Sequence, residues 1–298
     1  MDPFTLSGNK SQYLVEKEIG RGGLGIVYQA RALEYDLTVA VKQAGLEPIT
    51  DEKLRVQVRA QQKHQLNALG PLDHPNVSKV YDQFSDDAHE YLVMEFLQGS
   101  TLQKILYQTL DQERLLEESR VIGWALQVLD GLEYLHNQPQ PIIHRDLKPD
   151  NLFLNRDGRV VMVDFGLMKQ QIDRKHAGPT SDITHAMGTV EYAPLEQYAE
   201  SGSRTDTRTD LYSLGATLYH LLAGRLPPRA VDRLMTASMV ETLAKRPPSL
   251  RKINPTVGIR TEQIIFKAME IDPKERYHDA RDMRKHFNPR RRIMHLSV

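Results

Sequence analysis

Residues 144–151 read His-Arg-Asp-Leu-Lys-Pro-Asp-Asn, and Asp164-Phe165-Gly166 follows at the distance of a short hairpin. The two strings together supply a carboxylate, a lysine, an amide and a second carboxylate. A phosphoryl-transfer site needs these groups around a metal-bound phosphate and an attacking hydroxyl. Each string alone could arise by chance, but their combination at this spacing is far more specific. The sequence therefore predicts a phosphoryl-transfer site.

Two further strings near the N-terminus fit the same chemistry. Residues 20–28 read Gly-Arg-Gly-Gly-Leu-Gly-Ile-Val-Tyr, and residues 39–42 read Val-Ala-Val-Lys. A glycine-rich hairpin can lie flat on phosphate groups and offer them backbone N–H donors. By itself the glycine pattern predicts only a turn, and a lysine at a strand end often reaches to water. With the catalytic string downstream, we interpret the glycines as phosphate-binding and Lys42 as a phosphate ligand.

These strings, in this order, resemble those of protein kinases, and Lys148 is typical of the serine/threonine branch. Residues 192–226 resemble the bacterial, eukaryotic-like members of the family. The resemblance implies an α+β, bilobal fold with ATP in the cleft. Its small lobe is an antiparallel sheet of five strands with one helix, and its larger lobe is mostly helical. The expected organisation is a tag or disordered leader over 1–11, the small lobe over 12–95, the large lobe over 96–290 and a basic tail over 291–298.

The resemblance also implies a role for each polar residue of the site. Asp146 orients the substrate hydroxyl or accepts its proton, and Lys148 steadies the phosphoryl group during transfer. Asn151 and Asp164 hold Mg²⁺, or Mn²⁺ in its place, because hard cations take oxygen ligands. Thr189 bonds Asp146 and Lys148, as is usual for serine/threonine kinases. Most of the rate enhancement is then expected from positioning and charge neutralisation.

An adenine and phosphate pocket follows from the same resemblance. Met94 is expected at its back, and the backbone at Glu95 and Leu97 is expected to bond the adenine edge. Such pockets have mainly apolar walls with a few polar groups. The expected ATP-binding residues are Gly20, Gly22, Gly23, Gly25, Val27, Ala40, Lys42, Met94, Glu95, Leu97 and Phe153.

The clearest departure from the family lies in segment 51–69, which is expected to be helical. Related kinases pair the lysine of the preceding strand with a glutamate on this helix. Here the matching position is Gln65, or Gln62 in a shifted register, and residues 53–72 contain no acid. A neutral amide can accept a hydrogen bond but contributes no full charge. Either Lys42 bonds to a Gln side chain, or an acid from elsewhere in the chain substitutes.

Residues 164–196 correspond to the activation segment of the family. Thr180, Ser181 and Thr184 lie in its polar middle, and we expect one of them to be phosphorylated, with Thr184 as the first choice. Arg145 would pair with the added phosphate. Ordinary loop hydroxyls are the alternative for each single residue. Autophosphorylation of this segment would involve self-association of the protein.

Three residues are expected to act through the architecture alone. Glu196, in Tyr-Ala-Pro-Leu-Glu, should form a buried pair with Arg276, although the family usually has proline where Leu195 stands. Asp210 should begin a central helix and bond the backbone of the catalytic loop. Residues 117–136 place apolar side chains at helical spacing and predict a core helix without chemistry.

Composition limits the other possibilities. Thirty-nine basic residues balance 39 acidic ones, which argues against nucleic acid as a partner. No cysteine is present, so disulfides and thiolate metal sites are excluded, in keeping with a reducing compartment. The sequence predicts no membrane span and a cytoplasmic location, with this chain as the possible intracellular kinase domain of a larger protein.

Three functions are compatible with these motifs. The first is a serine/threonine protein kinase that uses ATP and acts on protein substrates. The second, favoured by Gln65, is a nucleotide-binding pseudokinase or a weakly active signalling scaffold. The third, a small-molecule phosphotransferase, is disfavoured by Thr189 and residues 192–196, which serve a protein substrate groove in the family.

Overall fold

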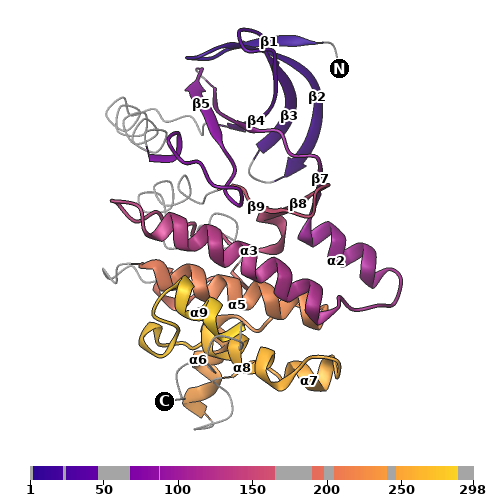
Figure 1. Cartoon of the computed structure of the whole chain (residues 1–298), viewed down its shortest axis with the longest axis vertical. Coiled ribbons are helices and arrows are strands. Elements are labelled where there is room, and N and C mark those ends of the chain that lie inside the picture. The colour runs from indigo at the N-terminus through magenta and orange to yellow at the C-terminus, as the bar shows by residue number, and fades with distance from the viewer. Residues whose placement is uncertain are drawn as a thin grey trace, which may run out of the picture. The chain divides into compact units, whose positions relative to one another are not determined.

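The structure is a computed structural model that divides into two compact units, residues 1–98 and 99–298. It describes residues 3–22, 25–45, 68–86, 88–164, 190–197, 205–239 and 246–287. Each unit has its own hydrophobic core and its own sheet (Figure 1).

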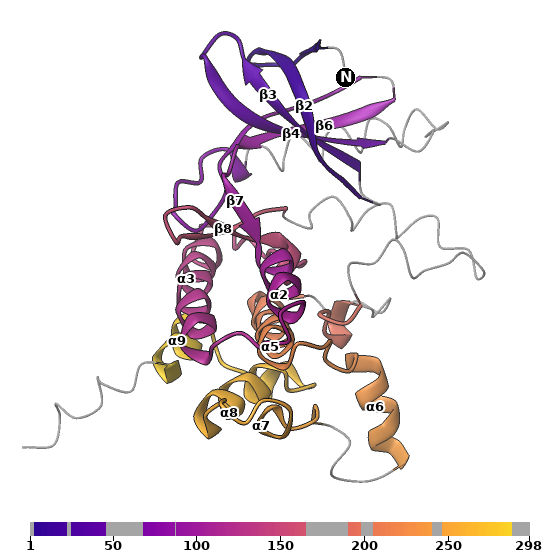
Figure 2. The same cartoon turned by 90° about the vertical axis from the view of Figure 1, so that its right-hand side faces the viewer.

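The first unit is built on a curled six-stranded antiparallel sheet with the order β1-β2-β3-β4-β6-β5 (Figure 1). Figure 2 shows strands β2, β3, β4 and β6 after a 90° turn about the vertical axis. The strands are β1 (Phe4–Ser7), β2 (Gln12–Gly22), β3 (Gly25–Ala32), β4 (Leu37–Gly45), β5 (Val80–Ser85) and β6 (His89–Glu95).

One face of this sheet forms the core of the unit. Alternate residues of each strand project to this face, as the period of two in a β-strand requires. Phe84 stacks on Tyr13 and Tyr91 with ring centroids 5.8 and 4.9 Å apart. The buried members of the cluster are Tyr13, Val15, Tyr28, Ala30, Ala32, Val39, Val41, Tyr91 and Val93.

Strand β1 corrects two expectations. The prediction of a disordered leader over 1–11 is wrong for residues 4–7, because they pair with β2 and add a sixth strand to the predicted five. The turn after β1 is also held to β5. The Asn9 Nδ2 donates to the Gln83 carbonyl (2.6 Å), and the Lys10 N–H donates to the Asp82 carboxylate (2.9 Å).

The second unit is mainly helical, with a small antiparallel sheet in the order β7-β8-β9. Its strands are β7 (Gly99–Thr101), β8 (Leu152–Asn155) and β9 (Val160–Met162). Its α-helices are α2 (Leu102–Leu110), α3 (Glu118–His136), α5 (Thr207–Ala223), α6 (Ala230–Met239), α7 (Leu250–Ile253), α8 (Ile259–Ala268) and α9 (Ala280–Phe287). Short 3-10 turns are η1 (Pro149–Asn151), η3 (Leu195–Gln197) and η4 (Pro273–Glu275).

Helix α5 is the centre of the second core. Every residue from Thr209 to Ala223 is buried, and α5 contacts α3 on one side and α8 on another (Figure 1). Asp206 caps its N-terminus by accepting from the Arg208 N–H (2.8 Å), and Gly224 ends it in the left-handed region with φ 67°. The predicted core helix over 117–136 is confirmed as α3.

No helix within the described ranges has the length and apolarity that a membrane span requires.

Candidate active site

The loop from α3 to β8 gathers three of the predicted catalytic residues. The Asn151 Nδ2 donates to both the backbone carbonyl (2.7 Å) and the Oδ2 carboxylate oxygen (2.9 Å) of Asp146. The Lys148 Nζ lies 3.4 Å from the same Oδ2. Asp146 is only 7% exposed, so these bonds fix the direction of its carboxylate. A carboxylate, an ammonium and an amide therefore meet at one point in the second unit.

Asn151 is also oriented for a second task. Because its Nδ2 is bonded to Asp146, its Oδ1 is the atom that remains for a metal ion or another donor. The Asn151 carbonyl accepts from the Val163 N–H (3.0 Å), which brings the next residue, Asp164, close to Asn151. The amide and carboxylate oxygens of this pair suit a hard divalent cation. No cluster of three or more His, Cys, Asp or Glu side chains that could hold a metal occurs among the described residues.

Asp210 fixes the backbone of the catalytic loop at His144 and Arg145. Its buried carboxylate accepts from the His144 N–H (2.9 Å), the Arg145 N–H (2.8 Å) and the His136 ring (Nε2 at 2.8 Å). Burial alone would raise the pKa of Asp210, but the His136 hydrogen bond and the neighbouring charges lower it below its ordinary value. A charged Asp210 therefore anchors two consecutive backbone groups, as the sequence predicted.

The anchored backbone is strained at two points. Arg145 has φ 66° and Asp164 has φ 62°, in the left-handed region that side chains other than glycine rarely adopt. Arg145 is held on both sides, because its N–H bonds Asp210 and its carbonyl accepts from the Gln197 Nε2 (2.9 Å). His144 is fully buried, burial lowers its pKa, and its Nε2 bonds the Val163 carbonyl (3.1 Å). His144 is thus a neutral packing residue.

The predicted pair of Glu196 and Arg276 is present. Two of the guanidinium nitrogens lie 2.6 and 3.2 Å from the Glu196 oxygens, and the Arg276 side chain is completely buried. Arg276 also donates to the carbonyls of Glu270 (2.7 Å) and Ile271 (3.0 Å) and lies over the Tyr212 ring. The segment that ends at Glu196 is therefore pinned to the turn before α9.

In the first unit, the glycine-rich hairpin is formed by β2 and β3. Gly22 lies opposite Gly25, and Gly20 lies opposite Val27. Gly25 has φ 123°, and a Cβ placed there would lie 1.9 Å from the Gln43 carbonyl oxygen. Glycine is required at this position because both the backbone angle and the approach of β4 exclude a side chain.

Four predicted ATP-binding residues share one face of this sheet, the face opposite the core cluster. Val27 lies opposite Lys42 across β3 and β4, and Ala40 lies opposite Met94 across β4 and β6. Lys42 and Ala40 are two residues apart in β4, so they project to the same side. Strand register thus brings together residues from three strands that the sequence could only place in separate motifs.

The segment after β6 agrees only in part with the expected adenine contact. The Glu95 N–H donates to the Lys79 carbonyl (2.9 Å), so this group is already used. Phe153 lies in β8 of the second unit, half-buried and opposite Thr101 and Val161.

Several expected site residues lie outside the described part of the chain. They are Gly23, Gln65, Thr180, Ser181, Thr184 and Thr189. Their expected roles stay predictions.

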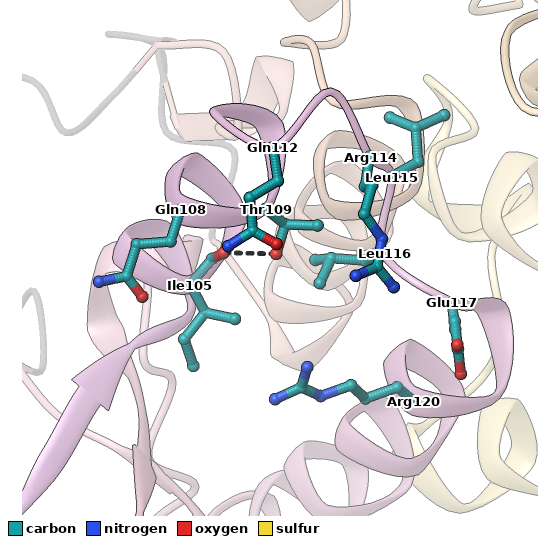
Figure 3. A pocket seen from close by; sticks show the side chains of 9 residues that line it. All are labelled: Ile105, Gln108, Thr109, Gln112, Arg114, Leu115, Leu116, Glu117 and Arg120. Atoms are coloured by element: carbon teal, nitrogen blue, oxygen red, sulfur yellow. Dashed lines mark hydrogen bonds between the residues drawn. The ribbon is translucent and has the colours of Figure 1, made fainter.

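A pocket of the second unit lies where α2 ends and α3 begins (Figure 3). The Thr109 hydroxyl on its wall donates to the Ile105 carbonyl (2.8 Å), and Arg120 lies over the Trp124 ring. None of the residues predicted for the active site lines it. Its polar lining residues are mostly exposed, and we assign it no chemistry.

Two residues at or near the site were not predicted from the sequence. His136, which bonds Asp210, looks like the last polar residue of a core helix. Glu90 is buried in β6 on the face that carries Lys42. The sequence contains a signal for Glu90, because a glutamate two residues before Leu92 and four before Met94 interrupts the apolar face that these residues form in the strand.

Comparison with known proteins identifies the family. The model of the protein kinase domain matches residues 13–287. The chain therefore belongs to the protein kinase family, which confirms the fold class and the family resemblance of its motifs.

The chain is also similar to individual members of the family. The chain is 31% identical to the serine/threonine-protein kinase PrkC of Bacillus subtilis over 275 residues, 91% of this chain and 39% of that protein. It is 33% identical to the serine/threonine-protein kinase pkn3 of Myxococcus xanthus over 273 residues, 89% of this chain and 47% of that protein. It thus spans less than half the length of these relatives. Both are named as kinases, so they lend no support to the pseudokinase alternative.

The solved kinase domain of PknI from Mycobacterium tuberculosis has the same fold. It superposes with a TM-score of 0.70 over 95% of this chain and 96% of that one, at 21% sequence identity.

Proposed function

We propose that this domain transfers the γ-phosphoryl group of ATP to serine or threonine hydroxyls of proteins. The observation that carries the proposal is the buried arrangement of Asp146, Lys148 and Asn151 in a member of the protein kinase family. The names of the bacterial relatives support serine and threonine as acceptors.

In the proposed reaction, the substrate hydroxyl attacks the γ-phosphorus, and the bond from that phosphorus to the ADP oxygen breaks. The proton of the hydroxyl passes to the Asp146 carboxylate, whose orientation is fixed by the hydrogen bond from Asn151. Lys148 offsets the negative charge that develops on the transferred group. A divalent metal, for which we propose Mg²⁺, would neutralise phosphate charge when it is held by the oxygens of Asn151 and Asp164.

In the first unit, we propose that the glycine hairpin and Lys42 bind the phosphates of ATP. The shared face of Val27, Ala40, Lys42 and Met94 supports this assignment, because apolar walls and one cation fit a purine nucleotide. Gly25 supports it as well, since a side chain there would collide with β4.

A radiolabelled phosphate-transfer assay with the purified chain tests the proposal. The parent should label protein, and Asp146→Asn should label it at a rate lower by about 10²–10⁴-fold, the usual contribution of a positioned general base. Binding of nucleotide without any labelling by the parent would contradict the proposal. Repeating the assay with Mg²⁺ and with Mn²⁺ tests which ion supports transfer.

We also propose that the protein phosphorylates its own activation segment, which requires two copies to meet, and that it acts in the cytoplasm. The hydroxyls of Thr180, Ser181 and Thr184 support the first point, together with Arg145, which follows a buried His in the anchored loop. Intact-mass analysis and peptide mapping after incubation with MgATP test it. Unmodified peptides over 170–189 would contradict it.

A further inference from the structure

The peptide group between Arg145 and Asp146 carries the residue that we assign as the base. Its carbonyl oxygen accepts from the Gln197 Nε2 (2.9 Å), and its N–H donates to the His144 Nδ1 over a longer distance of 3.4 Å. The Gln197 NH₂ group faces the carbonyl, because the amide oxygen would meet a second acceptor there. A peptide group is planar, so a bond to its oxygen also fixes the direction in which the chain continues to Asp146.

Gln197 and Asp210 hold the two peptide groups on either side of the Arg145 Cα atom. The Asp210 carboxylate accepts from the Arg145 N–H (2.8 Å), which belongs to the preceding peptide group. Between the two groups, the backbone of Arg145 has φ 66°. Residues other than glycine keep such an angle only where the surrounding structure holds it. Loss of the Gln197 bond should therefore allow this strained backbone to relax.

The position of Gln197 is itself well fixed. Glu196 and Gln197 belong to the short turn η3. The Glu196 carboxylate bonds the buried Arg276 guanidinium (2.6 and 3.2 Å) and accepts from the Thr209 hydroxyl of α5 (3.2 Å). Gln197 thus reaches the catalytic loop from a turn that is tied to the core of the second unit. A rigid support of this kind is what precise placement of a catalytic group requires.

The Gln197 amide is a poor choice for stability alone. The residue is half-buried, and its Oε1 is buried and accepts no hydrogen bond from the described residues. A buried acceptor without a donor costs free energy, so an apolar side chain of the same length would pack at lower cost. The bond to the peptide group of Asp146 is therefore a better explanation of the amide than packing.

We propose that Gln197 is a positioning residue for Asp146: its hydrogen bond to the Arg145 carbonyl holds the peptide group that carries the base in the orientation that transfer needs. The bond links the turn that contains Glu196 to the catalytic loop, 52 residues earlier in the chain. The inference rests on the proposed function, because it concerns the residue assigned as the base.

The first test measures phosphate transfer by the full chain at saturating ATP. Gln197→Met removes the donor but keeps the length of the side chain. It should lower kcat about five- to tenfold, the change that corresponds to one net hydrogen bond. The KM for ATP should not change, because Gln197 is assigned to the transfer step. Gln197→Glu places a carboxylate oxygen against the carbonyl and should lower kcat at least as much.

Gln138→Met is the matched control. Gln138 is also half-buried, and its Nε2 donates to the Tyr134 carbonyl at the same distance of 2.9 Å. The control should keep kcat within about twofold of the parent. Gln197→Met should melt close to the control, because each variant loses one comparable bond. A parental kcat for Gln197→Met, or a melting temperature more than about 4 °C below that of the control, would overturn the inference.

A double-mutant cycle with Asp146→Asn shows whether Gln197 acts through the base. Asp146→Asn should retain a low rate of transfer that comes from positioning and charge neutralisation. If Gln197 positions Asp146, Gln197→Met should leave this residual rate unchanged. An equal fold-loss in both backgrounds would show a general structural effect and rule out the assigned role.

Hydrogen exchange tests the inference without activity. The N–H groups of His144 and Arg145 both bond Asp210, so their exchange reports how firmly the loop is held. They should exchange about five- to tenfold faster in Gln197→Met than in the parent, and at the parental rate in Gln138→Met. Unchanged exchange in Gln197→Met would contradict the inference. Absence of phosphate transfer by the parent would instead contradict the proposed function, and exchange would still decide whether Gln197 holds the loop.

Discussion

The two units hold their site residues by different means. In the second unit, Asp146, Asn151 and Asp210 are fixed by short bonds between buried polar groups. In the first unit, Lys42 is placed by strand register and Gly25 by its backbone angle. Where a buried polar network sets the geometry, folding and chemistry depend on the same bonds. Where strand register sets the position of a site residue, its side chain can be substituted without loss of the sheet.

The strongest test of this difference is Arg276→Ala in the second unit. The substitution leaves the Glu196 carboxylate buried without its cation, so the free energy of unfolding should fall by about 3–5 kcal/mol. Urea unfolding measures it. Arg229→Ala removes the half-exposed pair with Asp232 and should cost less than about 1 kcal/mol. Equal small effects would mean that the buried pair does not hold the unit together.

Asp210→Asn should have the next largest effect. The substitution removes the charge that accepts from two backbone N–H groups and turns an NH₂ group toward one of them. The free energy of unfolding should fall by about 3 kcal/mol. Phosphate transfer should be lost as well. Denaturant titration and the transfer assay measure the two. An active variant with parental stability would show that the catalytic loop does not need its anchor.

Glu90→Gln should instead increase the free energy of unfolding, and the size of this increase should depend on pH. Between about pH 4.5 and pH 7, the folded state keeps a proton on Glu90 that the unfolded chain has lost, so the stability of the parent falls as pH rises. The variant lacks this titration. It should be more stable than the parent by about 3 kcal/mol at pH 8 and nearly equal to it at pH 4.5. Thermal melts of both proteins across this range check the sign. A constant difference would contradict it.

Lys42→Met should have the smallest effect on folding. Lys42 lies on the face opposite the core cluster, and its substitution should change the free energy of unfolding by less than about 0.5 kcal/mol. Phosphate transfer should nevertheless be lost. A large loss of stability would show that the lysine supports the sheet, and the comparison between the two units would not hold.

The sequence predicted more of the second unit than of the first. The string at 144–151 is contiguous, so the meeting of Asp146, Lys148 and Asn151 follows from local geometry. Family resemblance also supplied the distant pair of Glu196 and Arg276, which the structure contains. By contrast, the sequence predicts a tag or disordered leader where strand β1 lies. Its four residues carry a weak pattern, and they become a strand only because β2 offers them an edge.

The sequence by itself determined the family, the identity of the reactive groups and the glycine at position 25, since each depends on residues close together in the chain. Only the tertiary structure decided that His136 bonds Asp210, that Gln197 bonds the Arg145 carbonyl, and that a buried Glu90 lies on the face of Lys42. Burial and strand register depend on partners far along the chain, and no local pattern contains them.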